Sequence, residues 1–153
     1  MELRSQELRK IAPELDPLRL GTGWKVEDLS KPQIMIESTF GDSHPGSGHL
    51  LELVEEAREG IAEAGGHGAR YFTTDICDGE AQGHDGINYS LASRDMIANM
   101  IEIHANATPF DGAGTLNGCG KSEYSLYCSD RRRYGCGSGP ADTGTDWKIQ
   151  RNV

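Results

Sequence analysis

The sequence has few aromatic and hydrophobic residues and no long apolar run. Of 153 residues, 36% are hydrophobic and 7% aromatic, whereas glycine occurs 20 times, so we expect a modest core and many loops. A membrane-spanning helix needs about 20 consecutive apolar residues, and no stretch approaches that length. The first residues, Met1-Glu2-Leu3-Arg4, lack the apolar segment of a secretory signal. We therefore expect a soluble, cytoplasmic protein without a membrane partner.

Positive charge is also scarce. Lysine and arginine total 15 residues against 24 aspartates and glutamates, which gives a net charge of -9. Binding to a phosphate backbone requires a basic face. The composition therefore argues against nucleic acid as a partner.

The four cysteines, Cys77, Cys119, Cys128 and Cys136, contain no Cys-x-x-Cys pair. Without a secretory signal we do not expect a disulfide framework, so metal binding or catalysis becomes the more informative use. The spacings of nine and eight residues between the last three give only a weak zinc signal. Considered alone, Cys77 could equally be a small buried apolar residue.

The hydrophobic pattern predicts an α/β fold. A helix over 49–64 lies between strands over 32–38 and 69–76, and such a unit gives parallel strands with a right-handed crossover. A second helix over 93–107 and a third strand over 113–116 follow. We expect three layers, with a mostly parallel sheet and flanking helices.

Shorter features complete this prediction. Residues 1–30 form an N-terminal arm that Trp24 anchors, Ser47 is a plausible N-cap of the first long helix, and Met96 and Met100 belong to the core. The predicted domain covers residues 31–121.

Residues 122–153 differ in composition. From position 119 onward the only leucine, isoleucine or valine residues are Leu126, Ile149 and Val153. Such a segment buries too little apolar surface to offset the entropy of ordering. We expect a poorly ordered or loosely packed C-terminal tail.

Cys77 and Asp78 stand side by side where the second predicted strand gives way to a glycine-rich turn. Ligands of parallel sheets bind at the carboxyl ends of strands. Thiolates suit iron–sulfur clusters and zinc, while carboxylates suit magnesium and manganese. Since neighbouring side chains on extended backbone point to opposite sides, this turn could hold two different metals.

Longer motifs surround this pair. Cys77-Asp78-Gly79, the run from Gln82 to Gly86, the run from Tyr89 to Arg94, and Phe110-Asp111-Gly112 occur in this order. With them, residues 31–121 resemble the dihydroxy-acid dehydratase / 6-phosphogluconate dehydratase family. Members of that family are several times longer, so the resemblance is to the N-terminal part of a larger two-domain dehydratase.

The resemblance implies a hydro-lyase that converts a small 2,3-dihydroxy carboxylate or sugar acid to a 2-oxo acid. It implies an iron–sulfur cluster (2Fe-2S or 4Fe-4S) and Mg²⁺ as cofactors, and a homodimer for the full-length proteins. By position, Cys77 and Cys119 would be cluster ligands and Asp78 would bind the divalent ion. Lys121 matches a lysine that is carbamylated in some members, where it becomes a catalytic metal ligand.

The sequence also departs from the family pattern. Gly120 stands where the second motif, Cys-Asp-Lys, has its aspartate, and Pro45-Gly46-Ser47 occupies the loop in which one branch has a cysteine. The second departure favours the sugar-acid branch. The resemblance implies that the general base belongs to a C-terminal domain, for which we expect no counterpart in these residues. Two hypotheses remain open: a dehydratase, or a truncated, inactive fragment that acts at most as an interaction module.

Overall fold

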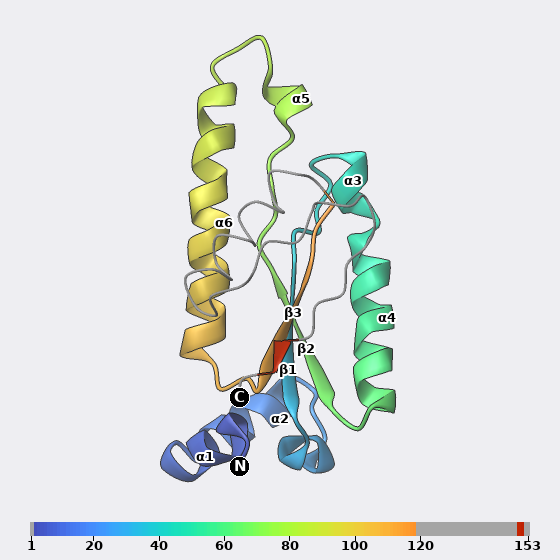
Figure 1. Ribbon diagram of the computed structural model, residues 1–153, viewed down its shortest axis with the longest axis vertical. Coiled ribbons are helices and arrows are strands. Elements are labelled where there is room, and N and C mark those ends of the chain that lie inside the picture. The colour runs from blue at the N-terminus through green and yellow to red at the C-terminus, as the bar shows by residue number, and fades with distance from the viewer. Residues whose placement is uncertain (1, 119–149, 152–153) are drawn as a thin grey trace.

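The computed structural model describes residues 2–118 and 150–151, which build a sheet between two long helices (Figure 1). The sheet contains β1 (Gln33–Ser38), β2 (His67–Phe72), β3 (Gly112–Leu116) and β4 (Gln150–Arg151), in the order β2-β1-β3-β4. β1 pairs in parallel with both β2 and β3, and the short β4 pairs antiparallel with β3. The predicted α/β class with a mostly parallel sheet is confirmed.

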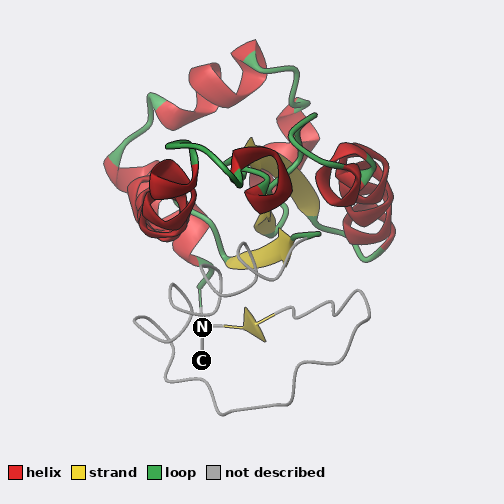
Figure 2. Ribbon diagram, turned by 90° about the horizontal axis from the view of Figure 1, so that it is seen from above, coloured by secondary structure: helices red, strands yellow, loops and turns green. Residues whose placement is uncertain are grey.

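The two long helices cover opposite faces of the sheet (Figure 2). α4 (Leu50–Glu63) connects β1 to β2, and α6 (Ile87–Ala107) connects β2 to β3. Because side chains alternate along a strand, the neighbours Met35 and Ile36 of β1 enter different cores. Met35 packs with Ile97 and Ile101 of α6, while Ile36 packs with residues of α4 and β3. This arrangement gives the three predicted layers.

The N-terminal arm docks at the amino ends of the strands (Figure 1). It contains α1 (Arg4–Ile11), α2 (Leu15–Gly21) and the 3-10 helix η1 (Val26–Ser30). Asp111 ties the arm to the sheet, because its two carboxylate oxygens accept the backbone N–H groups of Ser5 at 2.8 Å and Gln33 at 2.7 Å. Trp24 packs against the core formed with α6, as predicted. The centres of its ring and of the His67 ring are 3.9 Å apart.

Asp28 makes a second link between arm and sheet. Burial raises the pKa of Asp28, but hydrogen bonds from Lys31 Nζ and the Lys25 N–H, and the nearby His67, outweigh burial and lower the pKa to about 2. His67 Nδ1 lies 3.3 Å from Asp28 Oδ2. The carboxylate therefore joins η1 to the first residue of β2.

Several element boundaries differ from the prediction. β2 ends at Phe72 rather than at residue 76, because β1 ends at Ser38 and the Thr73 N–H makes the last bond to it, at 2.9 Å. α6 begins at Ile87, six residues earlier than residue 93. Ser47 does not cap α4: His49 occupies that position without a side-chain bond, and Ser47 is buried within the short helix α3 (Pro45–Gly48).

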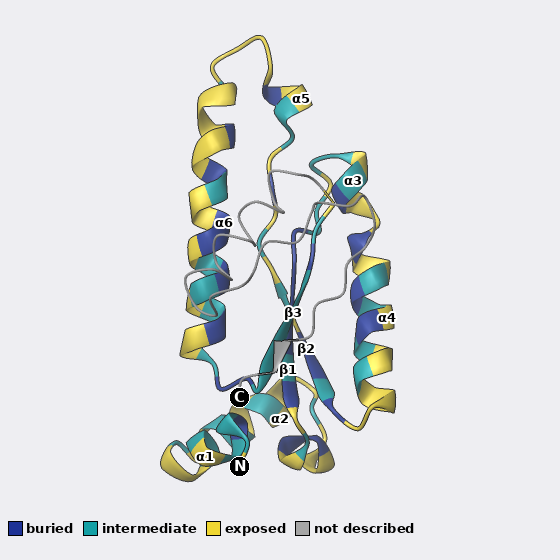
Figure 3. Ribbon diagram, viewed as in Figure 1, coloured by how far each residue is buried: buried dark blue, intermediate teal, exposed yellow. Residues whose placement is uncertain are grey.

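The expectation that Met96 belongs to the core is wrong. α6 is buried on the side that faces the sheet and exposed on the other (Figure 3). Met96 belongs to the exposed side, with 60% of its surface exposed. The predicted tail falls outside the described residues except for β4, so the boundaries of the predicted domain and tail stay predictions. Within the described part of the chain, no helix combines the length and apolar character of a membrane span.

Candidate functional site

Three segments meet where the parallel strands end. They are residues 39–48 after β1, 73–77 after β2, and 117–118 after β3. Hydrogen bonds hold them in place: the Thr39 N–H donates to Leu116 O at 3.1 Å, and the Thr74 side chain donates through Oγ1 to Phe40 O at 2.8 Å. This is the edge at which parallel sheets bind ligands.

Asp75 is the centre of a buried polar cluster at this edge. Its side chain has no exposed surface. Its carboxylate accepts hydrogen bonds from Ser43 Oγ at 2.7 Å and Ser47 Oγ at 2.9 Å through Oδ1, and its Oδ2 lies 3.1 Å from His44 Nε2. The cluster therefore fixes the loop after β1 against the segment that leads to Cys77.

The hydrogen bonds of His44 define its tautomer. Its Nδ1 accepts the Gly46 N–H at 3.0 Å, so in the neutral ring the proton is on Nε2. The Nε2–H group then donates toward Asp75 Oδ2. Aspartate, histidine and serine thus form a connected network. The carboxylate accepts bonds from both serines and faces His44, and Ser47 Oγ also lies 2.9 Å from His44 Nε2, so the buried charge is well supplied with partners.

Cys77 and Asp78 lie where residues 73–77 enter α5 (Asp78–Ala81). Both are half-buried, and Cys77 is the N-cap of α5 without a side-chain capping bond. Asp78 Oδ1 accepts a hydrogen bond from Ser90 Oγ, which is buried in the first turns of α6. The structure therefore leaves both residues half-accessible at this turn, with the Asp78 carboxylate held against α6.

The end of β3 reaches the same loop. A Cβ atom added to Gly118 would lie 1.7 Å from Gly46 O, so only glycine permits this approach of the two backbones. Because Asp75 and Gly118 both pack on residues 43–47, the chain leading to Cys77 and the chain leading to Cys119 are held by one loop. Cys119 and Lys121 themselves lie outside the described residues.

The described residues do not form a metal site on their own. Among residues 2–118, no group of three or more histidine, cysteine, aspartate or glutamate side chains is arranged to hold an ion. His49 is exposed, with Nδ1 3.4 Å from Pro45 O, and takes no part in the cluster. The assignments of Cys77, Asp78, Cys119 and Lys121 as ligands therefore stay predictions.

Sequence reasoning missed the Asp75 cluster. It assigned Asp75 to the strand over 69–76 and Ser47 to a helix cap, and it gave His44 no role. One signal was available: a serine- and histidine-containing loop after one strand, and an aspartate after the neighbouring parallel strand, end at the same edge.

Comparison with known proteins decides the family. A family model described as "Dihydroxy-acid/6-phosphogluconate dehydratase N-terminal" matches residues 31–127. The chain belongs to this dehydratase family. The match covers β1 to β3, the Asp75 cluster, and the Cys77–Asp78 pair.

Individual relatives in the family agree. Dihydroxy-acid dehydratase of Dehalococcoides mccartyi (strain CBDB1) is 43% identical over 110 residues, which are 72% of this chain and 20% of the relative. Dihydroxy-acid dehydratase of Methanothermobacter thermautotrophicus is 44% identical over 99 residues, 65% of this chain and 18% of the relative. The chain thus spans about a fifth of the length of the dehydratases that it matches.

The donor atoms present are compatible with the cofactors that the resemblance implies. Cys77 offers a soft sulfur ligand and Asp78 a hard oxygen ligand, as a cluster and a divalent ion require. Thr39 Oγ1 is buried at the same edge and has no hydrogen-bond partner within the described residues. A buried polar atom without a partner is unfavourable, which is consistent with further groups completing this edge.

Proposed function

We propose that this chain forms the N-terminal part of a hydro-lyase that removes water from a 2,3-dihydroxy carboxylate or sugar acid and yields a 2-oxo acid. The observation that supports the proposal most strongly is the Cys77–Asp78 pair at the carboxyl edge of a parallel sheet, in a chain of the dehydratase family. Both residues are half-buried and neither is fully enclosed.

The proposed cofactors are an iron–sulfur cluster and Mg²⁺, which supply Lewis-acid stabilisation of a departing hydroxyl and of the substrate carboxylate. Cys77 would bind the cluster, with Cys119 as a second ligand. Asp78 would bind Mg²⁺, with Lys121 as a further ligand if it is carbamylated.

The remaining described residues would serve as support. Ser90 orients the Asp78 carboxylate by its hydrogen bond, and the Asp75 cluster holds the backbone that leads to Cys77. Such support matters because the side chains that bind a metal must be held in the productive geometry before the substrate arrives. The general base would come from sequence beyond this chain.

Metal loading tests the proposal directly. The 153-residue chain is purified without oxygen, reconstituted with iron and sulfide, and assayed for protein-bound iron, acid-labile sulfide and visible absorption. We expect binding in the native chain and a clear loss in Cys77→Ser. Cys128→Ser is the matched control, since the resemblance gives Cys128 no role. Absence of iron and sulfide from the native chain, or equal loading of Cys77→Ser, would contradict the proposal.

The second candidate is a catalytically inactive fragment that acts at most as an interaction module. The observation that favours it is the chain's coverage of about a fifth of its relatives. The two candidates differ in turnover: 2-oxo acid production from a 2,3-dihydroxy carboxylate by the reconstituted chain alone would exclude the inactive fragment. A cluster-loaded chain without turnover would support a metal-binding portion whose activity depends on further residues of the kind that the longer relatives contain.

A further inference from the structure

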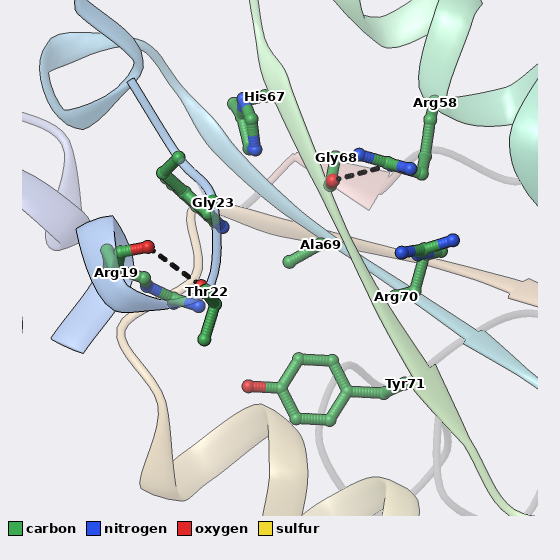
Figure 4. Close-up of a pocket in the computed structure, with 10 residues that line it drawn as sticks. Arg19, Thr22, Gly23, Arg58, His67, Gly68, Ala69, Arg70 and Tyr71 are labelled. Carbon is green, nitrogen blue, oxygen red and sulfur yellow. Dashed lines mark hydrogen bonds between the residues drawn. The ribbon is translucent and has the colours of Figure 1, made fainter. Parts of the chain in front are cut away.

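A second concave site lies at the other end of the sheet. It is a cavity of about 210 Å³ between the end of α2 and the amino-terminal half of β2. Arg19, Thr22 and Gly23 face His67, Gly68, Ala69 and Tyr71 across it, and Arg58 and Arg70 lie beside the strand (Figure 4). The cavity adjoins the start of β2, whereas Cys77 follows the end of this strand, so the two sites are separate.

Arg19 is the unusual residue of this cavity. Its guanidinium carbon lies 4.4 Å from the ring centre of Trp24 and 5.0 Å from that of Phe110. Nη2 is buried without a hydrogen-bond partner among the described residues, and no carboxylate there forms an ion pair with Arg19. Burial lowers the pKa of Arg19, which the neighbouring Tyr71 hydroxyl partly opposes.

The other two arginines at the cavity do not bring a carboxylate that could neutralise Arg19 among the described residues. Arg58 and Arg70 share a single carboxylate: Arg58 Nη1 lies 2.8 Å from Glu55 Oε2, and Arg70 Nη1 lies 2.5 Å from Glu55 Oε1. Among the described residues, Glu55 is thus the one carboxylate that pairs with any of the three guanidinium groups at the cavity, in a protein of net charge -9; Asp28 pairs instead with His67 and Lys31. A partly buried cation without a counter-ion is costly, and aromatic faces compensate only part of that cost.

We propose that this cavity binds a small anion, a carboxylate or phosphate, that acts as the counter-ion of Arg19. A guanidinium group presents a planar fork of N–H donors that matches both kinds of oxyanion. The cavity is smaller than the roughly 300–1,000 Å³ usual for drug-sized ligands, which favours a compact anion. A symmetric pairing of two copies through this cavity is less favourable, since it would bring Arg58 and Arg70 of one copy against those of the other.

This inference is independent of the proposed dehydratase chemistry, since no cofactor ligand contributes to the cavity. The test titrates the ¹⁵N-labelled 153-residue chain with malonate, with inorganic phosphate, and with chloride at equal ionic strength. Backbone amide shifts of Gly68 and Ala69 and the indole N–H of Trp24 report occupancy. We expect saturable shifts with malonate, phosphate or both, and only weak linear shifts with chloride.

Three variants locate the binding. Arg19→Met removes the proposed partner, and we expect the affinity to fall about tenfold or more, as for loss of a charged hydrogen bond. Arg70→Met, at a more exposed residue, should also weaken binding and provides a test if Arg19→Met does not fold. Lys10→Met is the control, because Lys10 pairs with Glu2 on the surface, away from the cavity. Non-saturating shifts with both anions, or equal affinity in Arg70→Met and Lys10→Met, would overturn the proposal.

Discussion

Replacing Asp75 by alanine tests whether the buried cluster organises the carboxyl edge of the sheet. The substitution removes an acceptor that receives bonds from Ser43, Ser47 and His44 at 2.7 Å, 2.9 Å and 3.1 Å. Those donors then lack this acceptor in a buried region, since the Asp75 side chain has no exposed surface. The consequence should be large for a single aspartate, since surface substitutions usually change the free energy of unfolding by less than about 0.5 kcal/mol.

The magnitude follows from the number and type of bonds. A hydrogen bond to a charged group is worth about 1.5–3 kcal/mol, so three independent bonds would total about 4.5–9 kcal/mol. Contacts in one network are not additive, and water can enter the space that alanine leaves. We therefore expect Asp75→Ala to lower the free energy of unfolding by about 3–5 kcal/mol, the range seen when one partner of a buried charged network is removed.

Asp75→Asn refines the test. Asparagine keeps the shape of aspartate and one of its oxygen acceptors. Its NH₂ group replaces the other oxygen, so that a donor then faces a donor. The loss should be smaller, about 1–3 kcal/mol, because fewer donors lose their partner.

Urea unfolding followed by circular dichroism at 222 nm measures both variants. The midpoint should fall while the slope with denaturant is unchanged, because the folded state buries the same surface. Asp42→Ala is the matched control: Asp42 is an exposed aspartate in the same loop. A loss below about 1 kcal/mol in Asp75→Ala, similar to the control, would refute the view that this carboxylate holds the loops together.

Three further predictions concern the rest of the fold. Gly118→Ala should cost more than about 2 kcal/mol in urea unfolding because its Cβ would lie 1.7 Å from a backbone oxygen, whereas Gly114→Ala, with nothing within 4 Å, should be neutral or stabilising. Met35→Ala should cost about 2–5 kcal/mol and Met96→Ala well under 1, and the reverse ranking would refute the assignment of helix faces. Because the pKa of Asp28 in the folded protein is lowered to about 2, the ionised carboxylate stabilises the fold fully above about pH 4, and this stabilisation is lost as the pH falls toward 2. Asp28→Asn should therefore make the free energy of unfolding less dependent on pH in this acid range, and an unchanged pH dependence would contradict this.

The order and type of the main elements were accessible from sequence because each depends on a local pattern. The stripe of Leu50, Val54 and Ala57 recurs at helical spacing, and strand 32–38 is a compact apolar run, so both were predicted within two residues. The family resemblance had the same origin: an ordered set of motifs around Cys77 and Asp78. Such patterns need no knowledge of what each element packs against.

Boundaries and helix faces were less accessible. The end of β2 depends on where its neighbour β1 stops, which residues 69–76 do not encode. Met96 and Ile97 are adjacent apolar residues of α6, yet one is 60% exposed and the other 1%. Apolar type alone does not distinguish them, because a helix that is apolar on several sides is oriented by its tertiary contacts.

By itself, the sequence determined that this chain is an α/β member of a dehydratase family, with a thiol and a carboxylate in the segment that follows the second strand. Those properties reside in neighbouring residues and in repeating local patterns. Only the tertiary structure decided that Asp75 binds His44 and two serines, that Gly118 meets Gly46, and that Arg19 faces a cavity at the far end of β2. The physical reason is that these contacts join segments tens of residues apart, whose proximity depends on the order and register of the strands.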